Sequence, residues 1–161
     1  MTYFQTLFQE LHSNVIEYNG NTYYRFFPIS IAGEALIKFK FIHSDSRFTQ
    51  AIVLFFSEGF DGRIDVNENS VPIRKRFPML NFWEDTAPNE FNVRITNYWG
   101  EINICNGSDP LGNKLFCKHL SEGCAMIVQQ LGDYHYQFLC HDHEFLGDCN
   151  NLIFEIQIIT Q

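Results

Sequence analysis

The sequence predicts an all-β protein, an antiparallel β-sandwich or jelly-roll-like barrel of about nine or ten strands with one short N-terminal helix. Three observations predict this class. Short segments alternate between apolar and polar residues, turn signals separate these segments, and helical spacing occurs only near the N-terminus. Because no second helical segment lies between the strands, a parallel sheet built from βαβ units is excluded.

The helix is predicted over residues 2–12. Apolar side chains recur there at helical spacing, at Phe4, Leu7, Phe8 and Leu11. They would share one face, which is typical of a short helix that closes one end of a barrel or sandwich. An amphipathic helix that binds a partner is the alternative.

A β-hairpin is predicted next, with strands at 15–18 and 22–29. Asn19 and Gly20 lie between these strands, and both residue types tolerate the positive φ angles of a tight hairpin turn. Pro28 lacks a backbone N–H, so it cannot donate a hydrogen bond to a neighbouring strand. We therefore expect Pro28 to mark either a sheet edge or the end of its strand.

Four further strands are predicted at 35–42, 47–56, 63–66 and 70–77. The first of them alternates between apolar and lysine side chains, as a half-buried antiparallel strand does. The second ends in an uninterrupted apolar run, which is consistent with a central strand. Residues 78–90 form the least regular segment and are predicted to be a loop.

The second half of the chain is predicted to hold strands at 91–96, 101–105, 124–131 and 134–141, and a last strand that ends at 159. Alternation in the strand 134–141 assigns one face to Tyr134, Tyr136, Phe138 and Cys140, and the other to His135, Gln137, Leu139 and His141. The aromatic face is expected to lie in the core and the histidine face to be the wetter one.

Length and composition predict one domain over residues 1–161. Apolar residues make up 45% of the chain and charged residues 19%, so the protein is globular and able to bury a core without disulfides. An odd count of five cysteines and the lack of a secretory signal in the given sequence predict reduced thiols in the cytoplasm. A secreted protein whose signal had been removed would look the same.

The net charge of the chain indicates which classes of partner it can bind. The net charge is −8, with only eleven lysines and arginines, whereas binding to nucleic acid requires a basic surface. The sequence therefore argues against nucleic acid and against an anionic membrane. It suits a basic protein partner, a metal ion or simple solubility.

The richest concentration of chemical side chains lies in residues 133–159. His141 and His143 are two residues apart, which in an extended chain places both on one side with their Cα atoms roughly 6.5–7 Å apart. Such a pair suits Zn²⁺ or Fe²⁺, with a third ligand from His135, Glu144 or Asp148.

Two other interpretations of the same stretch stay open. Oxygen-bearing side chains at Asp142, Asp148, Asn150 and Asn151 could instead bind Ca²⁺, which takes six to eight oxygen ligands. Alternatively, they form a turn rich in aspartate and asparagine that caps the last strand. No metal or other cofactor is required by the sequence.

Three aromatic residues are candidates for stacking on a ligand: Trp83, Tyr98 and Trp99. Such residues bind sugars or cationic groups when they are exposed. The competing interpretation for Trp83 is that it anchors its loop to the core.

Catalytic motifs are lacking in the sequence: it has no Gly-x-Ser-x-Gly, no glycine-rich phosphate loop and no His-Glu-x-x-His. The sequence therefore predicts a non-catalytic binding domain, of the accessory or immunity type found among small acidic bacterial proteins, that binds a basic protein partner. The alternatives are a carbohydrate-binding β-sandwich and a metal-dependent jelly-roll enzyme that uses His141 and His143.

Overall fold

The computed structural model describes residues 8–114, 124–142 and 151–160. Every pair of neighbouring strands is antiparallel, which confirms the predicted all-β class. The strands are β1 (Val15–Tyr18), β2 (Asn21–Tyr24), β3 (Phe27–Ser44), β4 (Gln50–Phe56), β5 (Arg63–Val66), β6 (Asn69–Val71), β7 (Met79–Trp83), β8 (Glu90–Ser108), β9 (Ala125–Gly132), β10 (His135–His141) and β11 (Leu152–Thr160).

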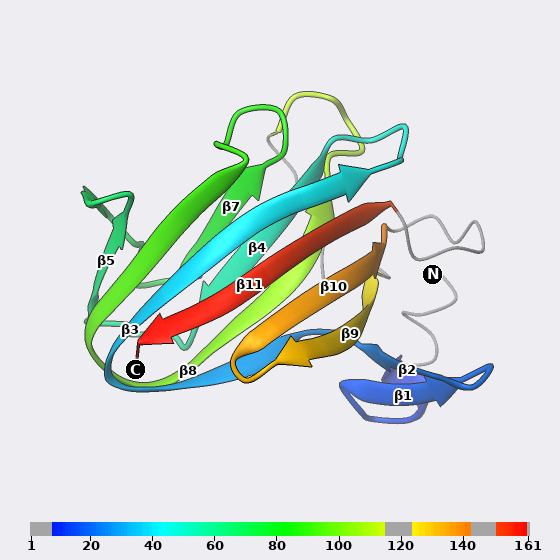
Figure 1. Cartoon of the computed structure of the whole chain (residues 1–161), viewed down its shortest axis with the longest axis horizontal. Helices are drawn as coiled ribbons and strands as arrows, with labels where there is room; N and C mark the ends of the chain where they lie inside the picture. The colour runs from blue at the N-terminus through cyan, green and yellow to red at the C-terminus, as the bar shows by residue number, and fades with distance from the viewer. Residues whose placement is uncertain (1–7, 115–123, 143–150, 161) are drawn as a thin grey trace.

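These strands form one sheet that folds over on itself into an open sandwich (Figure 1). The order along the sheet is β1-β2-β9-β10-β11-β3-β8-β4-β7, and β5 pairs with β8 and β6. The fold follows from the two longest strands, β3 and β8, which pair with each other from Phe27 to Lys40 and bend together at one corner.

The bend divides the sheet into two layers. One layer, which we call the narrow layer, consists of β4, β7, residues 27–33 of β3 and residues 98–108 of β8. The wide layer holds the remaining strands and the remaining parts of β3 and β8. At the corner the β3–β8 register shifts after Gly33, where φ is 91°, and Asn97 on β8 has a φ of 56°. Positive φ angles at these positions break the regular ladder and let both strands turn.

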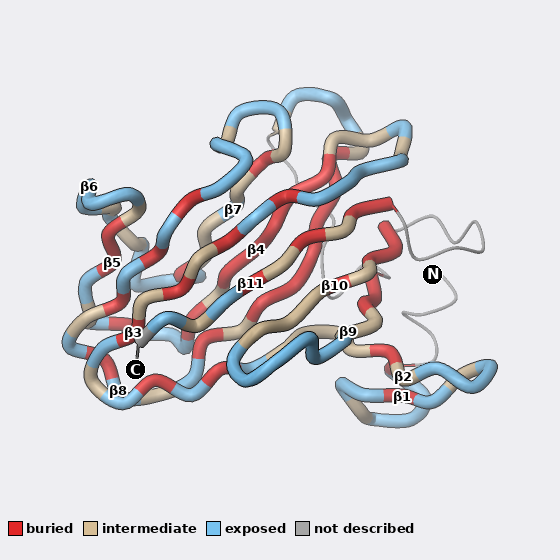
Figure 2. The backbone as a smooth tube through the Cα atoms, viewed as in Figure 1, coloured by how far each residue is buried: buried red, intermediate tan, exposed pale blue. Residues whose placement is uncertain are grey.

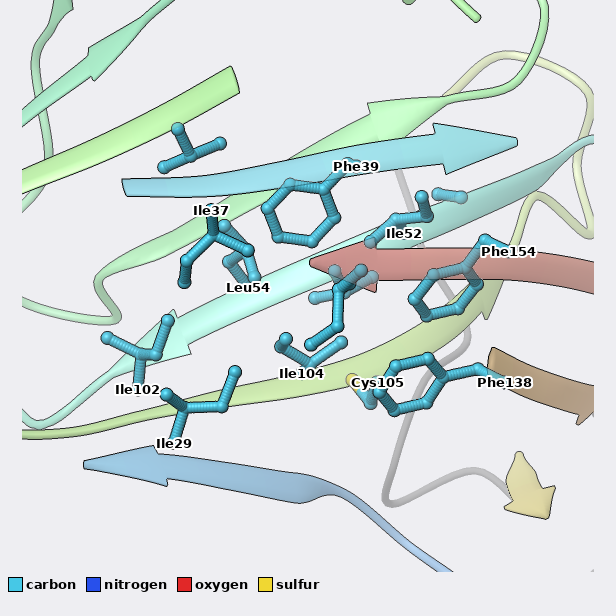
Figure 3. Close-up of a cluster of buried hydrophobic side chains, with 14 of the residues drawn as sticks. Ile29, Ile37, Phe39, Ile52, Leu54, Ile102, Ile104, Cys105, Phe138 and Phe154 are labelled. Carbon is cyan, nitrogen blue, oxygen red and sulfur yellow. The ribbon is translucent and has the colours of Figure 1, made fainter. Parts of the chain in front are cut away.

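The core lies between the two layers and is built from phenylalanine and isoleucine (Figure 3). Phe39 of the wide layer stacks on Phe91, with ring centroids 5.2 Å apart, and lies 6.3 Å from Phe82 of the narrow layer. Phe138 and Phe154 stack in parallel at 4.6 Å. Offset ring pairs of this kind add to the hydrophobic stabilisation of a core.

The predicted hairpin near the N-terminus is confirmed, but its second strand, predicted at 22–29, ends at Tyr24, and residues 27–29 belong to β3. Asn19 and Gly20 have φ angles of 50° and 79° and connect β1 to β2. The structure places a helical turn at residues 8–10, while residues 2–7 of the predicted helix lie outside the described part. Leu11 was expected on the apolar face but is 57% exposed, because it follows the helical turn and no longer keeps the helical spacing.

Several other strand boundaries differ from the expectation. The predicted strands 91–96 and 101–105 are parts of one strand, β8, and the predicted strand 35–42 continues back to Phe27 as β3. The reason is that β3 and β8 pair with each other through the corner, so the turn-like residues near Asn97 bend the ladder without ending it.

The loop predicted at 78–90 also contains β7, a strand that pairs with β4. Because β4 also pairs with β8 on its other side, it has a neighbouring strand on each side. This confirms the central position predicted for residues 47–56. By contrast, the predicted strand 70–77 is limited to β6, which ends at Val71 before Pro72. Proline stops the ladder there because it has no N–H to donate.

The edge position predicted for Pro28 is confirmed within the described strands, since residues 27–33 of β3 pair with β8 alone. In the described residues, no helix has the length and apolar character that crossing a membrane requires.

Candidate functional site

Of the residues that were predicted to bind a metal, the structure describes His135, His141 and Asp142, and it places His135 far from the other two. His141 is the last residue of β10, Asp142 follows it, and they are 0% and 3% exposed. His135 starts the same strand, six residues earlier, so it lies roughly 20 Å from His141 at the rise of an extended chain. His143 and Asp148 lie outside the described residues. Within the described part, no group of three or more metal-ligating side chains comes together.

His135 instead belongs to a surface pair on the wide layer. Its Nε2 lies 3.2 Å from Oε2 of Glu155 on the neighbouring β11. Gln137 donates a second hydrogen bond, of 3.2 Å, to the other oxygen of that carboxylate. Glu155 therefore ties two side chains of β10 to β11 across the strands.

His141 was expected on the wetter face of its strand but is fully buried. The Nδ2 atom of Asn106 donates a 2.6 Å hydrogen bond to the backbone oxygen of His141, and the imidazole stacks near Tyr23 of β2 at 6.3 Å. Residues that are distant in the sequence, Tyr23 and Asn106, thus cover the end of β10, which alternation within the strand could not reveal.

Asp142 and Asn151 form hydrogen bonds that connect three strand ends. Ser46 Oγ donates to Asp142 Oδ2, and the backbone N–H of Asp142 donates to Asn151 Oδ1 at 3.2 Å. Asn151 Nδ2 in turn donates to the backbone oxygen of Asp45 at 3.0 Å. These contacts match the interpretation of a polar turn that caps the last strand, because the side chains satisfy backbone groups.

The three aromatic residues predicted to stack on a ligand lie in different environments. Trp83 is 9% exposed, with Lys114 Nζ 6.0 Å from its ring, and Tyr98 is 6% exposed. Tyr98 packs against Phe60 and its hydroxyl donates to the backbone oxygen of Glu101. Only Trp99, 72% exposed, presents its ring to solvent, so the three do not form one accessible platform.

The structure also contains a site that was not predicted from the sequence, which we call the open-edge groove. It is a hollow of about 390 Å³ between residues 27–32 of β3 and the ends of β10 and β11. Its lining residues are uncharged: Phe27, Pro28, Ile29, Ser30, Ala32, Tyr134, Tyr136 and Ile158.

The groove exists because the two layers have different widths. In the described strands the narrow layer ends at β3, while the wide layer continues through β11, β10 and β9. Tyr136 and Ile158 follow the alternation of the buried Phe138 and Ile156, so they lie on the core face of the wide layer. They are only half-buried, because the narrow layer does not reach far enough to cover them. Figure 2 shows part of β10 in tan, the colour of intermediate burial.

Tyr134 completes one wall of the groove. It was expected in the core, on the same face as Phe138, but it lies in the turn before β10 with a φ of 60° and is 58% exposed. A positive φ removes a residue from the alternation of the strand that follows, so the tyrosine side chain is released to the surface.

The rim of the groove carries negative charge and one exposed indole. Glu101 lies opposite Ser30, and Trp99 opposite Ala32, on the neighbouring β8. The Trp99 ring lies over Gly33, where a Cβ atom would be 3.4 Å from the indole. Asp133 precedes Tyr134 and is exposed, and neither Glu101 nor Asp133 forms an ion pair with a described residue.

Two further hollows, of about 180 and 300 Å³, lie on the outer face of the wide layer. Their charged side chains pair with one another: Lys38 with Glu90 at 3.6 Å in the first hollow, and Arg63 with Asp65 at 3.0 Å in the second. Since these charges are neutralised within the face, the open-edge groove offers the more distinct binding surface.

Pro28 was the one sequence signal that pointed toward the groove, because it predicted a strand edge. The fold defines the class as an antiparallel β-sandwich whose sheet is not closed into a barrel. Comparisons with known protein families, with curated proteins and with solved structures return no match.

Proposed function

We propose that the protein is a non-catalytic interaction domain, of the accessory or immunity type, that captures a basic partner protein. The observation that carries this proposal is the open-edge groove, an uncharged hollow beside a strand edge with acidic residues at its rim. Exposed apolar surface bordered by polar residues is typical of protein–protein interaction sites.

The groove provides the anchoring contacts. Tyr134 and Trp99 are the large aromatic side chains at its border, 58% and 72% exposed. Aromatic residues commonly supply most of the binding energy of an interface, because each buries a large area at a small cost in side-chain entropy.

The charge provides the selectivity. The whole chain carries a net charge of −8, and two exposed carboxylates neighbour residues that line the groove: Glu101 lies opposite Ser30 and Asp133 precedes Tyr134. A field of this sign accelerates encounters with a basic protein and disfavours an acidic one. We therefore expect a partner with excess lysine and arginine.

Affinity capture tests the proposal. The immobilised protein is incubated with cell extract at increasing salt, alongside Tyr134→Ala and, as a matched control, Phe77→Ala, which removes an aromatic ring that is 76% exposed outside the groove. We expect retained proteins to be basic and to be lost with Tyr134→Ala but not with Phe77→Ala. With the purified partner, raising the salt concentration should slow association at least about tenfold.

Two results would contradict the proposal. One is capture that Tyr134→Ala and salt leave unchanged, which would show binding elsewhere. The other is an isolated partner that is acidic.

A further inference from the structure

We infer that the open-edge groove binds a proline-rich segment of the partner in the polyproline II conformation, with lysine or arginine beside the prolines. This inference rests on the proposed function and names the kind of segment that the groove holds. Three features of the groove carry it: the aromatic lining, the tyrosine hydroxyls and the neighbouring carboxylates.

Side chains, rather than the backbone of β3, offer the contacts in the groove. Pro28 has no N–H to donate, and Ser30 already has an interaction partner. A polyproline II segment does not need these backbone groups. It forms no internal hydrogen bonds and its prolines have no N–H, so it is recognised through side chains instead of by extension of a sheet.

The lining of the groove suits proline rings. Phe27 and Tyr136 pack against each other with ring centroids 5.1 Å apart, and Pro28 and Tyr134, both exposed, line the same hollow. Proline-rich segments dock in aromatic-lined grooves, where their apolar rings pack on the aromatic side chains. Because such a segment is already extended before it binds, it loses little conformational entropy.

The hydroxyls of Tyr134 and Tyr136 supply hydrogen bonds. No hydrogen bond joins either hydroxyl to a described residue. The carbonyl oxygens of a polyproline II segment all face its surroundings, because none is used within the segment. The tyrosines can therefore donate to these carbonyls while their rings pack against the prolines.

The length of the groove sets the spacing of the prolines. Residues 28–32 of β3, along which the groove runs, span roughly 13 Å of extended chain. A polyproline II helix rises about 3.1 Å per residue, so about five residues cover this distance. Since the helix has three residues per turn, side chains three apart face the groove together. We therefore expect two prolines at this spacing.

The neighbouring charges require basic residues beside the prolines. Glu101 lies opposite Ser30 on β8, and Asp133 precedes Tyr134. Both carboxylates are exposed, and neither forms an ion pair with a described residue. Trp99, two residues before Glu101 and 72% exposed, offers its ring to a cationic side chain. A lysine or arginine at each end of the segment would use these groups.

A second copy of this chain does not provide such a segment. The chain has five prolines, and no two of them are three residues apart. Each copy also carries a net charge of −8, and like charges at close range oppose the contact. The ligand is therefore a segment of a different protein.

Synthetic peptides test the inference. The probe is the acetylated and amidated peptide Arg-Pro-Pro-Ala-Pro-Pro-Arg. Two controls keep its charge: Arg-Gly-Gly-Ala-Gly-Gly-Arg, which is flexible, and Arg-Val-Val-Ala-Val-Val-Arg, which favours a β-strand. A third, Glu-Pro-Pro-Ala-Pro-Pro-Glu, keeps the conformation and reverses the charge. In an NMR titration we expect the probe to bind at least about tenfold more tightly than each control, one power of ten in Kd.

Variants of the protein separate the contributions of the groove. Tyr134→Phe removes only a hydroxyl, and we expect it to weaken the probe about three- to tenfold through the lost hydrogen bond. Glu101→Gln should weaken the probe by a similar factor, and it should leave the affinity for the glutamate peptide unchanged or raised. Phe77→Ala, outside the groove, should leave the affinity for the probe unchanged.

The position of the bound probe is a second measurement. We expect nuclear Overhauser effects between the proline protons of the probe and the rings of Phe27 and Tyr136. Residues of β7, at the far edge of the narrow layer, should show none.

Three outcomes would overturn the proline-rich ligand. They are binding of the valine or glycine peptide as tight as that of the probe, Overhauser effects that lie outside the groove, and an affinity for the probe that neither Tyr134→Phe nor Glu101→Gln lowers. Each leaves the capture of a basic partner intact, because that proposal depends on the affinity experiment with Tyr134→Ala. Failure of the peptide and the capture experiments together would reject the groove as a binding site.

Discussion

At the scale of single residues, hydrogen bonds to the backbone hold the polar side chains where β3, β10 and β11 end. Asn151 is 5% exposed. Its side chain accepts a hydrogen bond from Asp142 and donates one to Asp45, and its backbone N–H donates to the oxygen of Cys140 at 3.1 Å. A buried amide with a donor and an acceptor both satisfied stabilises the fold.

Replacement of this amide tests its role. We expect Asn151→Ala to lower the free energy of unfolding by about 2 kcal/mol, because the buried N–H of Asp142 and the partly buried backbone oxygen of Asp45 lose their partners. Urea denaturation measures the change, with Asn81→Ala, an exposed asparagine on β7, as the control. An unchanged unfolding midpoint for Asn151→Ala would show that the hydrogen bonds of Asn151 do not contribute to stability.

At the scale of elements, the corner of β3 and β8 determines the architecture. Both strands continue through the bend and pair on each side of it, so one pair of strands supplies both layers. Gly33 suits the corner because its φ of 91° is strained for any other residue. The Trp99 ring lies over Gly33, so a Cβ atom there would contact the indole at 3.4 Å.

Substitution of the corner glycine should therefore be costly. We expect Gly33→Ala to destabilise the protein by about 1–3 kcal/mol through backbone strain and to shift the fluorescence of Trp99, whose ring the new methyl group would touch. Gly20→Ala is the matched control, since Gly20 also has a positive φ, of 79°, but open space around it.

The control separates two causes of the destabilisation. If both variants lose the same stability and the Trp99 fluorescence stays constant, strain alone accounts for the effect. In that case the contact between Gly33 and Trp99 does not help to form the corner.

At the scale of the whole molecule, the contact between the layers holds the sandwich together. Phe39 is fully buried and contacts rings from both layers, Phe91 of the wide layer and Phe82 of the narrow one. These two rings also stack on each other at 4.5 Å. The three phenylalanines therefore link the layers at the centre of the core.

Removal of the central ring should weaken the entire protein. We expect Phe39→Ala to lower the free energy of unfolding by about 3–5 kcal/mol, because it leaves a cavity between the layers. Phe39→Leu should cost less, since it keeps much of the apolar volume. Far-UV circular dichroism and tryptophan fluorescence should report the same unfolding midpoint for each variant, as expected of one domain.

Separate midpoints from the two probes would contradict a single cooperative unit. Phe77→Ala serves as the control, because Phe77 is 76% exposed and its loss should change stability by less than about 0.5 kcal/mol.

Local patterns in the sequence determined the fold class and many of its elements. Strict alternation identified the strand that contains Ile37 and Phe39, and Asn19-Gly20 identified the first hairpin. Pro28 identified a strand edge. Each of these signals depends on neighbours in the chain, either through the period of an extended strand or through the φ angles that a residue type tolerates.

Only the tertiary structure decided what those elements do together. It buried His141, brought Asn151 to the ends of three strands and exposed Tyr134, and it joined predicted separate strands into β3 and β8. The open-edge groove is of this kind as well. It depends on how far one layer reaches over the other, and the width of a layer is set by pairing between strands that are distant in the sequence, which no local period records.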